Sequence, residues 1–219
     1  MRTVAVLPVK TFSRAKQRLS RAIGEDERRE LAAAMVADVL EALTRVEGLD
    51  SVIVVTAEPL AAEAARTAGA GVVLDPEEAG QSPAAERGIV AARERDAERV
   101  LLVPGDCPAL DAAEVTELLA LETGPGVVIV PDRHGSGTNA LLLTPPDVLH
   151  PSFGPGSFAR HAAHARGAGT AVRVARLPSL ELDVDTPDDL GALREAVSAG
   201  GGAQRTRARL DGLPAATAQ

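Results

Sequence analysis

The stretch R-V-L-L-V-P-G-D-C-P-A-L, residues 99–110, decides the fold of this chain. Its apolar run, Val100 to Val103, is typical of a strand buried on both faces of a parallel sheet. A Pro-Gly pair then ends the strand and leaves Asp106 in a tight turn at its carboxyl end. Ligands bind at that edge of open α/β sheets, so this position favours a divalent cation. The alternative is an Asx-turn cap for the next helix, but Asp111 is better placed to cap it.

The composition excludes several classes of protein. The chain has 219 residues, of which 45% are apolar, which is enough for the core of one domain. The net charge of −8 and the absence of Trp and Tyr exclude a nucleic-acid surface. The single cysteine, Cys107, excludes an internal disulfide and fits a reducing compartment. With no membrane span or signal-peptide pattern, we expect a cytoplasmic protein without membrane partners, and a homodimer is left open.

The order of predicted elements indicates an α/β fold. Strands are predicted at residues 3–9, 51–56, 72–74, 100–103, 127–130, 140–143 and 172–177, followed by an alternating acidic strand over 180–185. Helices are predicted at residues 26–46, 59–68, 84–97 and 112–121, with two more beginning near Ser157 and Pro187. This order predicts a single-domain, mostly parallel sheet flanked by helices. We expect residues 1–198 to form that domain and residues 199–219 to be a disordered tail.

A basic loop follows the first predicted strand. It contains Lys10, Arg14, Lys16 and Arg18 within nine residues of an otherwise acidic chain. Cations at this edge of a sheet, before a helix, favour a bound anion such as phosphate. A solvated basic turn is the alternative. The two commonest nucleotide-binding loops, the Walker loop and G-x-G-x-x-G, are absent.

Acidic residues near the end of the chain suggest a metal site. Asp188 and Asp189 are explained as acids in the first turn of a helix. Asp183 and Asp185 have no such explanation, and they could meet Asp106 around one Mg²⁺, which prefers carboxylate and phosphate oxygens. Together with the basic loop, such a site describes transfer at an α-phosphate, driven by positioning and charge neutralisation.

Polar groups also occur in two Gly-rich segments, residues 131–143 and 151–161, and at one helix start. Ser82 could touch a nucleotide, although a plain N-cap explains it better. The hydroxyl of Ser157 at a helix N-terminus suits a phosphate or carboxylate. His161 and His164 are three residues apart on the same predicted helix. Without further ligands nearby, a zinc pair is less favoured than solvent-facing or ligand-adjacent histidines.

Five motifs carry a resemblance to a known family. They are L-P-V-K with A-K-x-R-L, G-D-C-P-x-L, P-D-R-x-x-x-G-T-N-A-L, F-G-x-x-S-F and D-V-D-T-P-D-D-L, in that order over residues 3–195. The chain resembles the guanylyltransferases of coenzyme F-420 biosynthesis, namely phosphoenolpyruvate guanylyltransferase and 2-phospho-L-lactate guanylyltransferase. The resemblance implies a nucleotide-diphospho-sugar transferase (GT-A-like) fold. It also implies that GTP and a phosphorylated three-carbon acid give a guanylyl-diphospho product and pyrophosphate.

The resemblance also assigns roles to residues of this chain. It implies catalytic roles for Lys10, Lys16 and Asp106; nucleotide binding by Lys10, Lys16, Arg18 and Ser82; binding of the phospho-acid by Thr138, Gly154 and Ser157; and Mg²⁺ binding by Asp106, Asp183 and Asp185. The chain departs from the family at residues 80–85, G-Q-S-P-A-A, where a stretch like G-L-N-A-A is expected. The Asn that would help to recognise the base is missing there.

Three questions stay open at this point. The sequence does not distinguish phosphoenolpyruvate from 2-phospho-L-lactate, which differ by a methylene against a methyl carbon. A cytidylyl- or molybdopterin-guanylyl-type transferase of the same fold is an alternative that the departure at residues 80–85 keeps open. A module that binds a nucleotide without reacting is an alternative of a different class.

Overall fold

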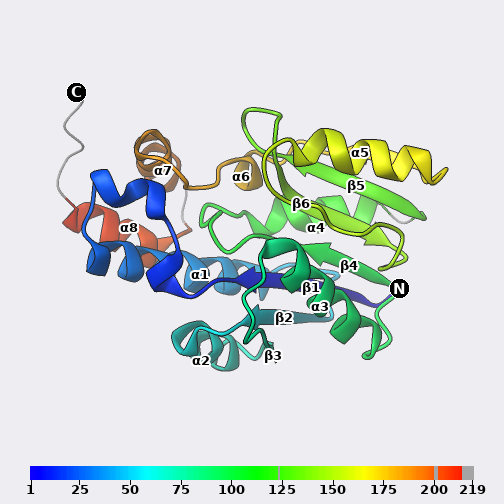
Figure 1. Ribbon diagram of the computed structural model, residues 1–219, viewed down its shortest axis with the longest axis horizontal. Helices are drawn as coiled ribbons and strands as arrows, with labels where there is room; N and C mark the ends of the chain where they lie inside the picture. The colour runs from blue at the N-terminus through cyan, green and yellow to red at the C-terminus, as the bar shows by residue number, and fades with distance from the viewer. Residues whose placement is uncertain (123, 200–201, 214–219) are drawn as a thin grey trace.

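The computed structural model describes residues 1–122, 124–199 and 202–213, which form a seven-stranded sheet with helices on both faces (Figure 1). The strands are β1 (Thr3–Val9), β2 (Ser51–Thr56), β3 (Gly71–Leu74), β4 (Arg99–Leu102), β5 (Gly126–Pro131), β6 (Thr138–Thr144) and β7 (Val172–Val174). Their order across the sheet is β3-β2-β1-β4-β6-β5-β7. The predicted α/β fold is confirmed, and β1 and β4 lie side by side near its centre.

Strand β6 is antiparallel to both of its neighbours, β4 and β5, whereas the other pairs are parallel. Because it runs backwards, its first residue, Thr138, lies at the edge where the parallel strands end. This edge therefore collects the loops after β1 and β4 together with the start of β6. Such carboxyl-terminal edges are where ligands bind in open α/β sheets.

The helices divide between the two faces of the sheet. They are α1 (Glu25–Leu43), α2 (Pro59–Thr67), α3 (Gln81–Arg93), α4 (Ala112–Leu121), α5 (Ser157–Gly167), α6 (Pro178–Glu181), α7 (Pro187–Ala199) and α8 (Gln204–Gly212). Alternate residues of β1 point to opposite faces, so Leu7 joins a core with α1 and α4, and Val6 joins one with α3 and α5. Within the described ranges, no helix is both long and apolar enough to cross a bilayer.

The predicted acidic strand over residues 180–185 is wrong. Helix α6 ends at Glu181, and extended backbone then crosses the end of the sheet. Leu180 and Val184 are both fully buried, so the apolar alternation reflects anchoring in the core rather than strand pairing. Strand β5 is already paired on both sides, by β6 and β7, and offers this segment no free edge. Strand β7 also ends at Val174, before the predicted residue 177.

The predicted disordered tail does not hold for Gln204–Gly212, which form α8 against α1. Thr206 and Leu210, four residues apart, are buried on one side of this helix. The buried carboxylate of Asp38 in α1 accepts hydrogen bonds from the backbone N–H groups of Arg205 and Thr206, at 3.3 and 2.7 Å. This cap comes from 167 residues earlier in the chain, so no local pattern announces it. Residues 200–201 and 214–219 of the predicted tail lie outside the described part.

Candidate functional site

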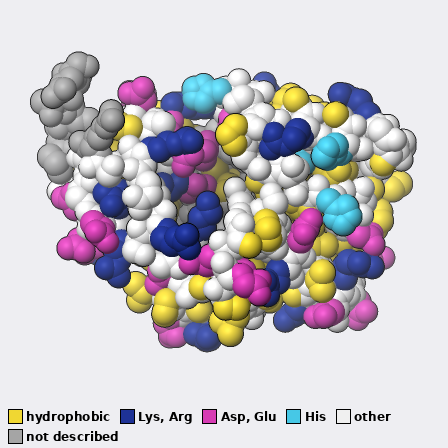
Figure 2. Space-filling view, in the orientation of Figure 1, with side chains coloured by type: hydrophobic (Ala, Val, Ile, Leu, Met, Phe, Trp, Pro, Cys, Tyr) yellow, Lys and Arg dark blue, Asp and Glu magenta, His cyan; other side chains and the backbone are white. Residues whose placement is uncertain are grey.

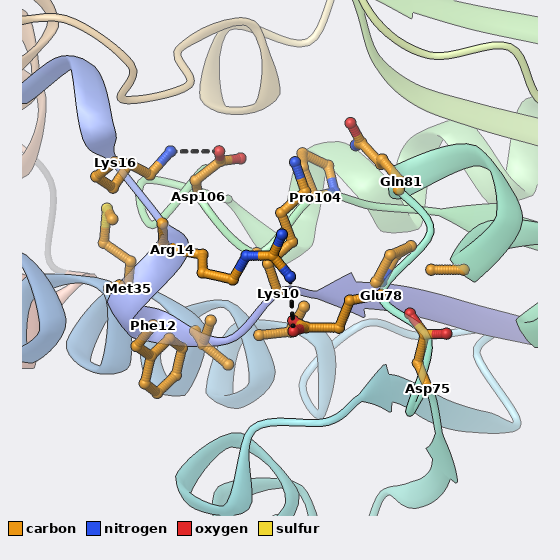
Figure 3. Close-up of a pocket in the computed structure, with 18 of the residues that line it drawn as sticks. Lys10, Phe12, Arg14, Lys16, Met35, Asp75, Glu78, Gln81, Pro104 and Asp106 are labelled. Carbon is orange, nitrogen blue, oxygen red and sulfur yellow. Dashed lines mark hydrogen bonds and ion pairs between the residues drawn. The ribbon is translucent and has the colours of Figure 1, made fainter.

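A cavity of about 170 Å³ lies at the carboxyl edge of the sheet, beside the ends of β1 and β4. In Figure 2 basic side chains gather around a hollow on this face, with acidic side chains among them. The close-up in Figure 3 shows that the cavity is lined by the loop after β1, the turn after β4 and the segment before α3. Its polar lining includes Lys10, Arg14, Lys16, Asp75, Glu78, Gln81, Asp106 and Asp185.

Lys16, Asp106 and Asp185 form a compact ionic group, here called the lysine–aspartate cluster. The Lys16 ammonium lies 2.5 Å from Asp106 Oδ2 and 3.2 Å from Asp185 Oδ1 (Figure 3 shows the first contact). The Lys16 side chain is only 7% exposed. Burial alone would lower the pKa of Lys16, but the two adjacent carboxylates outweigh it and raise the pKa above its ordinary value. Lys16 therefore stays charged at the cavity.

The conformation of Lys16 reflects this placement. It has a left-handed backbone (φ 54°) between two short 3₁₀ turns, Phe12–Arg14 and Gln17–Arg21. A non-glycine residue in this region costs free energy and often marks a functional position. Phe12 is buried and anchors the first turn to the core, while Leu19 anchors the second. The basic loop is thus a fixed structure, and the expected convergence of Lys16 with Asp106 and Asp185 is observed.

Asp183 lies near the cluster but outside its ionic contacts. Its carboxylate accepts a hydrogen bond from Asn139 Nδ2 at 3.3 Å. Burial, followed by repulsion from Asp106, raises the pKa of Asp183 to about 6. In the described part of the chain, no three His, Cys, Asp or Glu side chains are arranged to hold a metal ion. The structure thus brings Asp106 and Asp185 together around Lys16, and a metal role for all three aspartates stays a prediction.

Asp185 is held in place by Asp189, whose importance the sequence did not reveal. Asp189 Oδ2 accepts hydrogen bonds from the backbone N–H groups of Asp185 and Thr186, at 2.9 and 2.6 Å. Its other oxygen is paired with Arg133, from the loop after β5. Thr186 also forms an N-terminal capping pair with Asp189, which is the one local signal of this turn. The cap and the ion pair together fix the backbone that carries Asp185.

The other cations of the basic loop are more exposed. Lys10 lines the cavity, and the Arg18 guanidinium lies 3.6 Å from Asp185 Oδ2 at 70% exposure. Arg14 pairs with Glu78 at 3.3 Å, and Glu78 also accepts hydrogen bonds of 2.7 Å from the N–H and hydroxyl of Thr11. These bonds lower the pKa of Glu78 and tie the loop after β3 to the loop after β1. Glu78 was missed because this pairing joins residues distant in the sequence.

Ser82 does not occupy the N-cap position expected of it. Helix α3 begins at Gln81 with Gly80 as its N-cap, so Ser82 lies inside the first turn. Its hydroxyl accepts a hydrogen bond of 2.8 Å from the backbone N–H of Phe153. Ser82 therefore connects the segment lining the cavity to the loop before α5, and direct contact with a nucleotide stays a prediction.

Thr138, Gly154 and Ser157, the predicted acid-binding residues, lie around the start of α5. Gly154 has φ 109°, a conformation that favours glycine, and Ser157 is 1% exposed as the first residue of α5. Thr138 Oγ1 lies 3.0 Å from Nδ1 of His161. His161 is fully buried, so the solvent-facing alternative is wrong for it, and a position beside a ligand stays a prediction. The apolar face of α5 turns it inward, whereas His164 is exposed.

The fold is one that solved nucleotide-diphospho-sugar transferases and nucleotidyltransferases share. A protein from Desulfovibrio desulfuricans G20, named as a nucleotide-diphospho-sugar transferase, has a similar structure, with a TM-score of 0.77 at 18% identity over 97% of this chain and 95% of that one. A structure titled as Rv0371C of Mycobacterium tuberculosis H37Rv in complex with manganese has a TM-score of 0.56 at 21% identity over 89% of this chain and 99% of that one. At these identities the likeness concerns the fold.

The sequence comparison gives the family. The model described as "Guanylyl transferase CofC like" matches residues 3–206, and the chain belongs to this family. It is 52% identical to a phosphoenolpyruvate guanylyltransferase of Conexibacter woesei, over 97% of both chains. A protein of the same name from Sphaerobacter thermophilus is 42% identical, over 88% of this chain and 93% of that one. The family resemblance found in the five motifs is thereby confirmed.

Proposed function

We propose that this chain transfers GMP from GTP to phosphoenolpyruvate with release of pyrophosphate, as a step of coenzyme F-420 biosynthesis. Membership of the guanylyl transferase family supports the reaction class. Identity of 52% over nearly the whole length to a protein named phosphoenolpyruvate guanylyltransferase supports phosphoenolpyruvate over 2-phospho-L-lactate. A cytoplasmic location is part of the proposal, because the sequence contains one cysteine and can form no internal disulfide.

The observation that carries the proposal is the lysine–aspartate cluster at the edge of the cavity. In the reaction a phosphate oxygen of the acid attacks the α-phosphorus of GTP. The bond from that phosphorus to the bridging oxygen breaks, and pyrophosphate leaves with the electron pair. Lys16 is held charged where negative charge builds up, while Lys10 lines the cavity and the exposed Arg18, paired with Asp185, lies at its rim to meet the triphosphate. Fixed cations of this kind stabilise the transition state without rearranging.

The residues at the cluster fit a divalent cation, which we propose to be Mg²⁺. Three carboxylates, those of Asp106, Asp183 and Asp185, repel one another there, and this repulsion contributes to the raised pKa of Asp183. Hard cations such as Mg²⁺ bind to one or two carboxylates together with phosphate oxygens. When bound, the ion would neutralise charge on the phosphates. Asp106 and Asp185 are the ligands best placed to hold it, with Asp183 beside them.

The acid is proposed to bind beside this metal site, at Thr138, Gly154 and Ser157. Asn139 connects the two regions, because it follows Thr138 directly and donates a hydrogen bond to Asp183. Ser157 is buried at the N-terminus of α5, where its hydroxyl and the positive end of the helix dipole favour an anion. No hydrogen bond of the Ser157 hydroxyl is found among the described residues, which leaves it available to a ligand.

Pyrophosphate release tests the proposal. GTP, ATP and CTP would each be combined with phosphoenolpyruvate, 2-phospho-L-lactate and 3-phosphoglycerate, in the presence of Mg²⁺. We expect GTP with phosphoenolpyruvate to give the highest kcat/KM. Preference for CTP or ATP would contradict the guanylyl assignment, and preference for another acid would contradict the choice of phosphoenolpyruvate. Binding of GTP without turnover with any acid would favour a nucleotide-sensing module instead.

A further inference from the structure

His161 connects the two halves of the proposed acid site. On one side, Nδ1 lies 3.0 Å from the hydroxyl oxygen of Thr138, at the start of β6. On the other, Nε2 accepts a hydrogen bond of 2.8 Å from the backbone N–H of Ser152, in the loop that carries Gly154. The ring also meets the Phe153 ring edge-on, with centroids 5.4 Å apart. A fully buried imidazole that uses both nitrogens in this way has one orientation.

The backbone contact determines which nitrogen carries the proton. A backbone N–H can only donate, so Nε2 must present its lone pair to Ser152. The neutral ring then carries its proton on Nδ1 and donates it to Thr138 Oγ1. With its oxygen accepting from His161, the Thr138 hydroxyl has its own proton free to donate. Phosphate and carboxylate oxygens accept hydrogen bonds, so this is the orientation that an acidic phosphate ester requires.

We propose that His161 is a positioning residue for the acid substrate, which it serves by turning the Thr138 hydroxyl into a donor aimed at the acid. The inference rests on the proposed function, because it takes Thr138 to contact the acid. His161 itself does not touch the substrate. Its effect passes through one hydrogen bond to Thr138, and its bond to Ser152 selects the tautomer that makes that hydrogen bond.

The loop that supplies Ser152 is rigid enough to select the tautomer. Arg160, the residue before His161, donates hydrogen bonds to the backbone oxygens of Ser152 and Pro155, at 2.9 and 2.5 Å. The N–H of Phe153 is bound by Ser82 from α3. The peptide at Ser152 therefore keeps its N–H directed at the imidazole. Such fixed supporting residues are what hold a substrate-binding group within a fraction of an ångström of its working position.

Steady-state kinetics on four single variants, one double variant and one control tests the proposal. His161→Phe removes both hydrogen bonds, and Thr138→Val removes the hydroxyl. His161→Asn places an amide N–H close to where Nδ1 lies, so it can still donate to Thr138. His161→Gln instead extends an amide to the position of Nε2, so it can accept from Ser152 but not serve Thr138. His164→Ala, on the exposed face of the same helix, is the matched control.

The expected pattern is specific to the acid. His161→Phe, His161→Gln and Thr138→Val raise the KM for phosphoenolpyruvate about tenfold or more, as loss of a hydrogen bond to a charged group does. The KM for GTP stays within about twofold, because the two hydrogen bonds of His161 go to Thr138 and Ser152, neither of which is a proposed nucleotide-binding residue. His161→Asn keeps the KM for the acid within about threefold of the unchanged protein. The double variant His161→Phe with Thr138→Val is no worse than Thr138→Val alone, because both changes remove the same interaction.

The outcomes separate this inference from the proposed function. If Thr138→Val leaves the KM for the acid unchanged, the acid does not bind at Thr138, and the proposed site is wrong along with the inference. If Thr138→Val raises that KM while His161→Phe does not, the site stands and the positioning role of His161 is overturned. Equal damage from His161→Asn and His161→Phe would show a purely structural role and also overturn it.

A measurement that needs no activity tests the tautomer directly. Nitrogen-15 chemical shifts of the imidazole at pH 7 distinguish a protonated ring nitrogen from one with a free lone pair. We expect protonated Nδ1 and unprotonated Nε2 for His161. The opposite tautomer, or an imidazolium, would remove the donor to Thr138 and contradict the proposal even if every variant failed to fold.

Discussion

The two polar clusters at the carboxyl edge of the sheet are held by opposite means. The lysine–aspartate cluster is charged and partly exposed, with Asp185 at 47% exposure, and opposite charges hold it together. The group formed by Thr138, Ser152 and His161, here called the histidine cluster, is neutral and held by directed hydrogen bonds around a buried ring. A charged cluster can adapt to phosphates and a metal ion, whereas a neutral buried one fixes a single donor direction. The contrast suggests that the nucleotide and the acid are recognised by different physical means.

The largest effect is expected from removing the cation of the lysine–aspartate cluster. Lys16→Met keeps much of the buried stem and deletes the charge between two carboxylates. We expect kcat/KM for the full reaction to fall about 10²–10³-fold or more, as removal of a preorganised electrostatic group does. Arg18→Met is the matched control, since that cation is exposed at the rim, and its effect should be smaller. Equal losses in the two variants would contradict the special role of the buried ammonium.

The two clusters also differ in how visible they are in the sequence. Lys16 lies in the loop after the apolar run of β1, and Asp106 lies in the turn after that of β4, so strand prediction alone places both at one edge of the sheet. The seven strands were predicted near their observed positions for the same reason. The hydrogen bond between His161 and Thr138 was not predictable. The position of a histidine on an amphipathic helix does not indicate which residue of a distant strand its ring will contact.

The other errors have the same origin. The segment 180–185 alternates like a strand, but pairing depends on a free sheet edge, which only the assembled sheet reveals. Helix α8 was predicted as part of a disordered tail, because its cap, Asp38, belongs to α1. Apolar periodicity thus predicts which elements form and which face is buried. It does not predict contacts between polar groups that are far apart in the chain.

A second prediction concerns the histidine cluster and pH. Burial, followed by the nearby charges of Arg160 and His164, lowers the pKa of His161 from 6.5 to about 4. Between these pH values the unfolded chain binds a proton that the folded protein does not, so the free energy of unfolding falls as the pH drops from about 6.5 toward 4. Above about pH 6.5, His161 does not reduce the free energy of unfolding. Once the pH has fallen below about 4, the reduction amounts to about 3 kcal/mol.

Denaturant unfolding between pH 4 and 7 measures this dependence. His161→Asn does not titrate there, so its free energy of unfolding should depend less steeply on pH than that of the unchanged protein. His164→Asn removes the smallest of the three causes of the lowered pKa of His161, so it should change the slope far less than His161→Asn does. If the slope is the same in all three proteins, His161 is not a buried neutral residue and the description of the histidine cluster fails.

The smallest effect is expected from changing Asp189, whose hydrogen bonds hold the backbone of Asp185 in the lysine–aspartate cluster. Asp189→Asn leaves an oxygen that can still accept from the turn, but it removes the charge paired with Arg133. Asp185 should then be held less firmly. We expect the Mg²⁺ concentration for half-maximal activity to rise about tenfold, the usual effect of losing a residue that orients a metal ligand. The free energy of unfolding should fall by about 1–3 kcal/mol.

The neighbouring acid supplies the control for Asp189. Asp188 lies in the same first turn of α7 but is exposed, so Asp188→Asn should leave the Mg²⁺ requirement unchanged and alter stability by less than about 0.5 kcal/mol. A similar Mg²⁺ response in both variants would mean that general negative charge, rather than the held position of Asp185, attracts the ion. If the Mg²⁺ requirement rises in Asp189→Asn alone, the lysine–aspartate cluster also depends on fixed hydrogen bonds. The two clusters would then differ in how much they depend on such bonds.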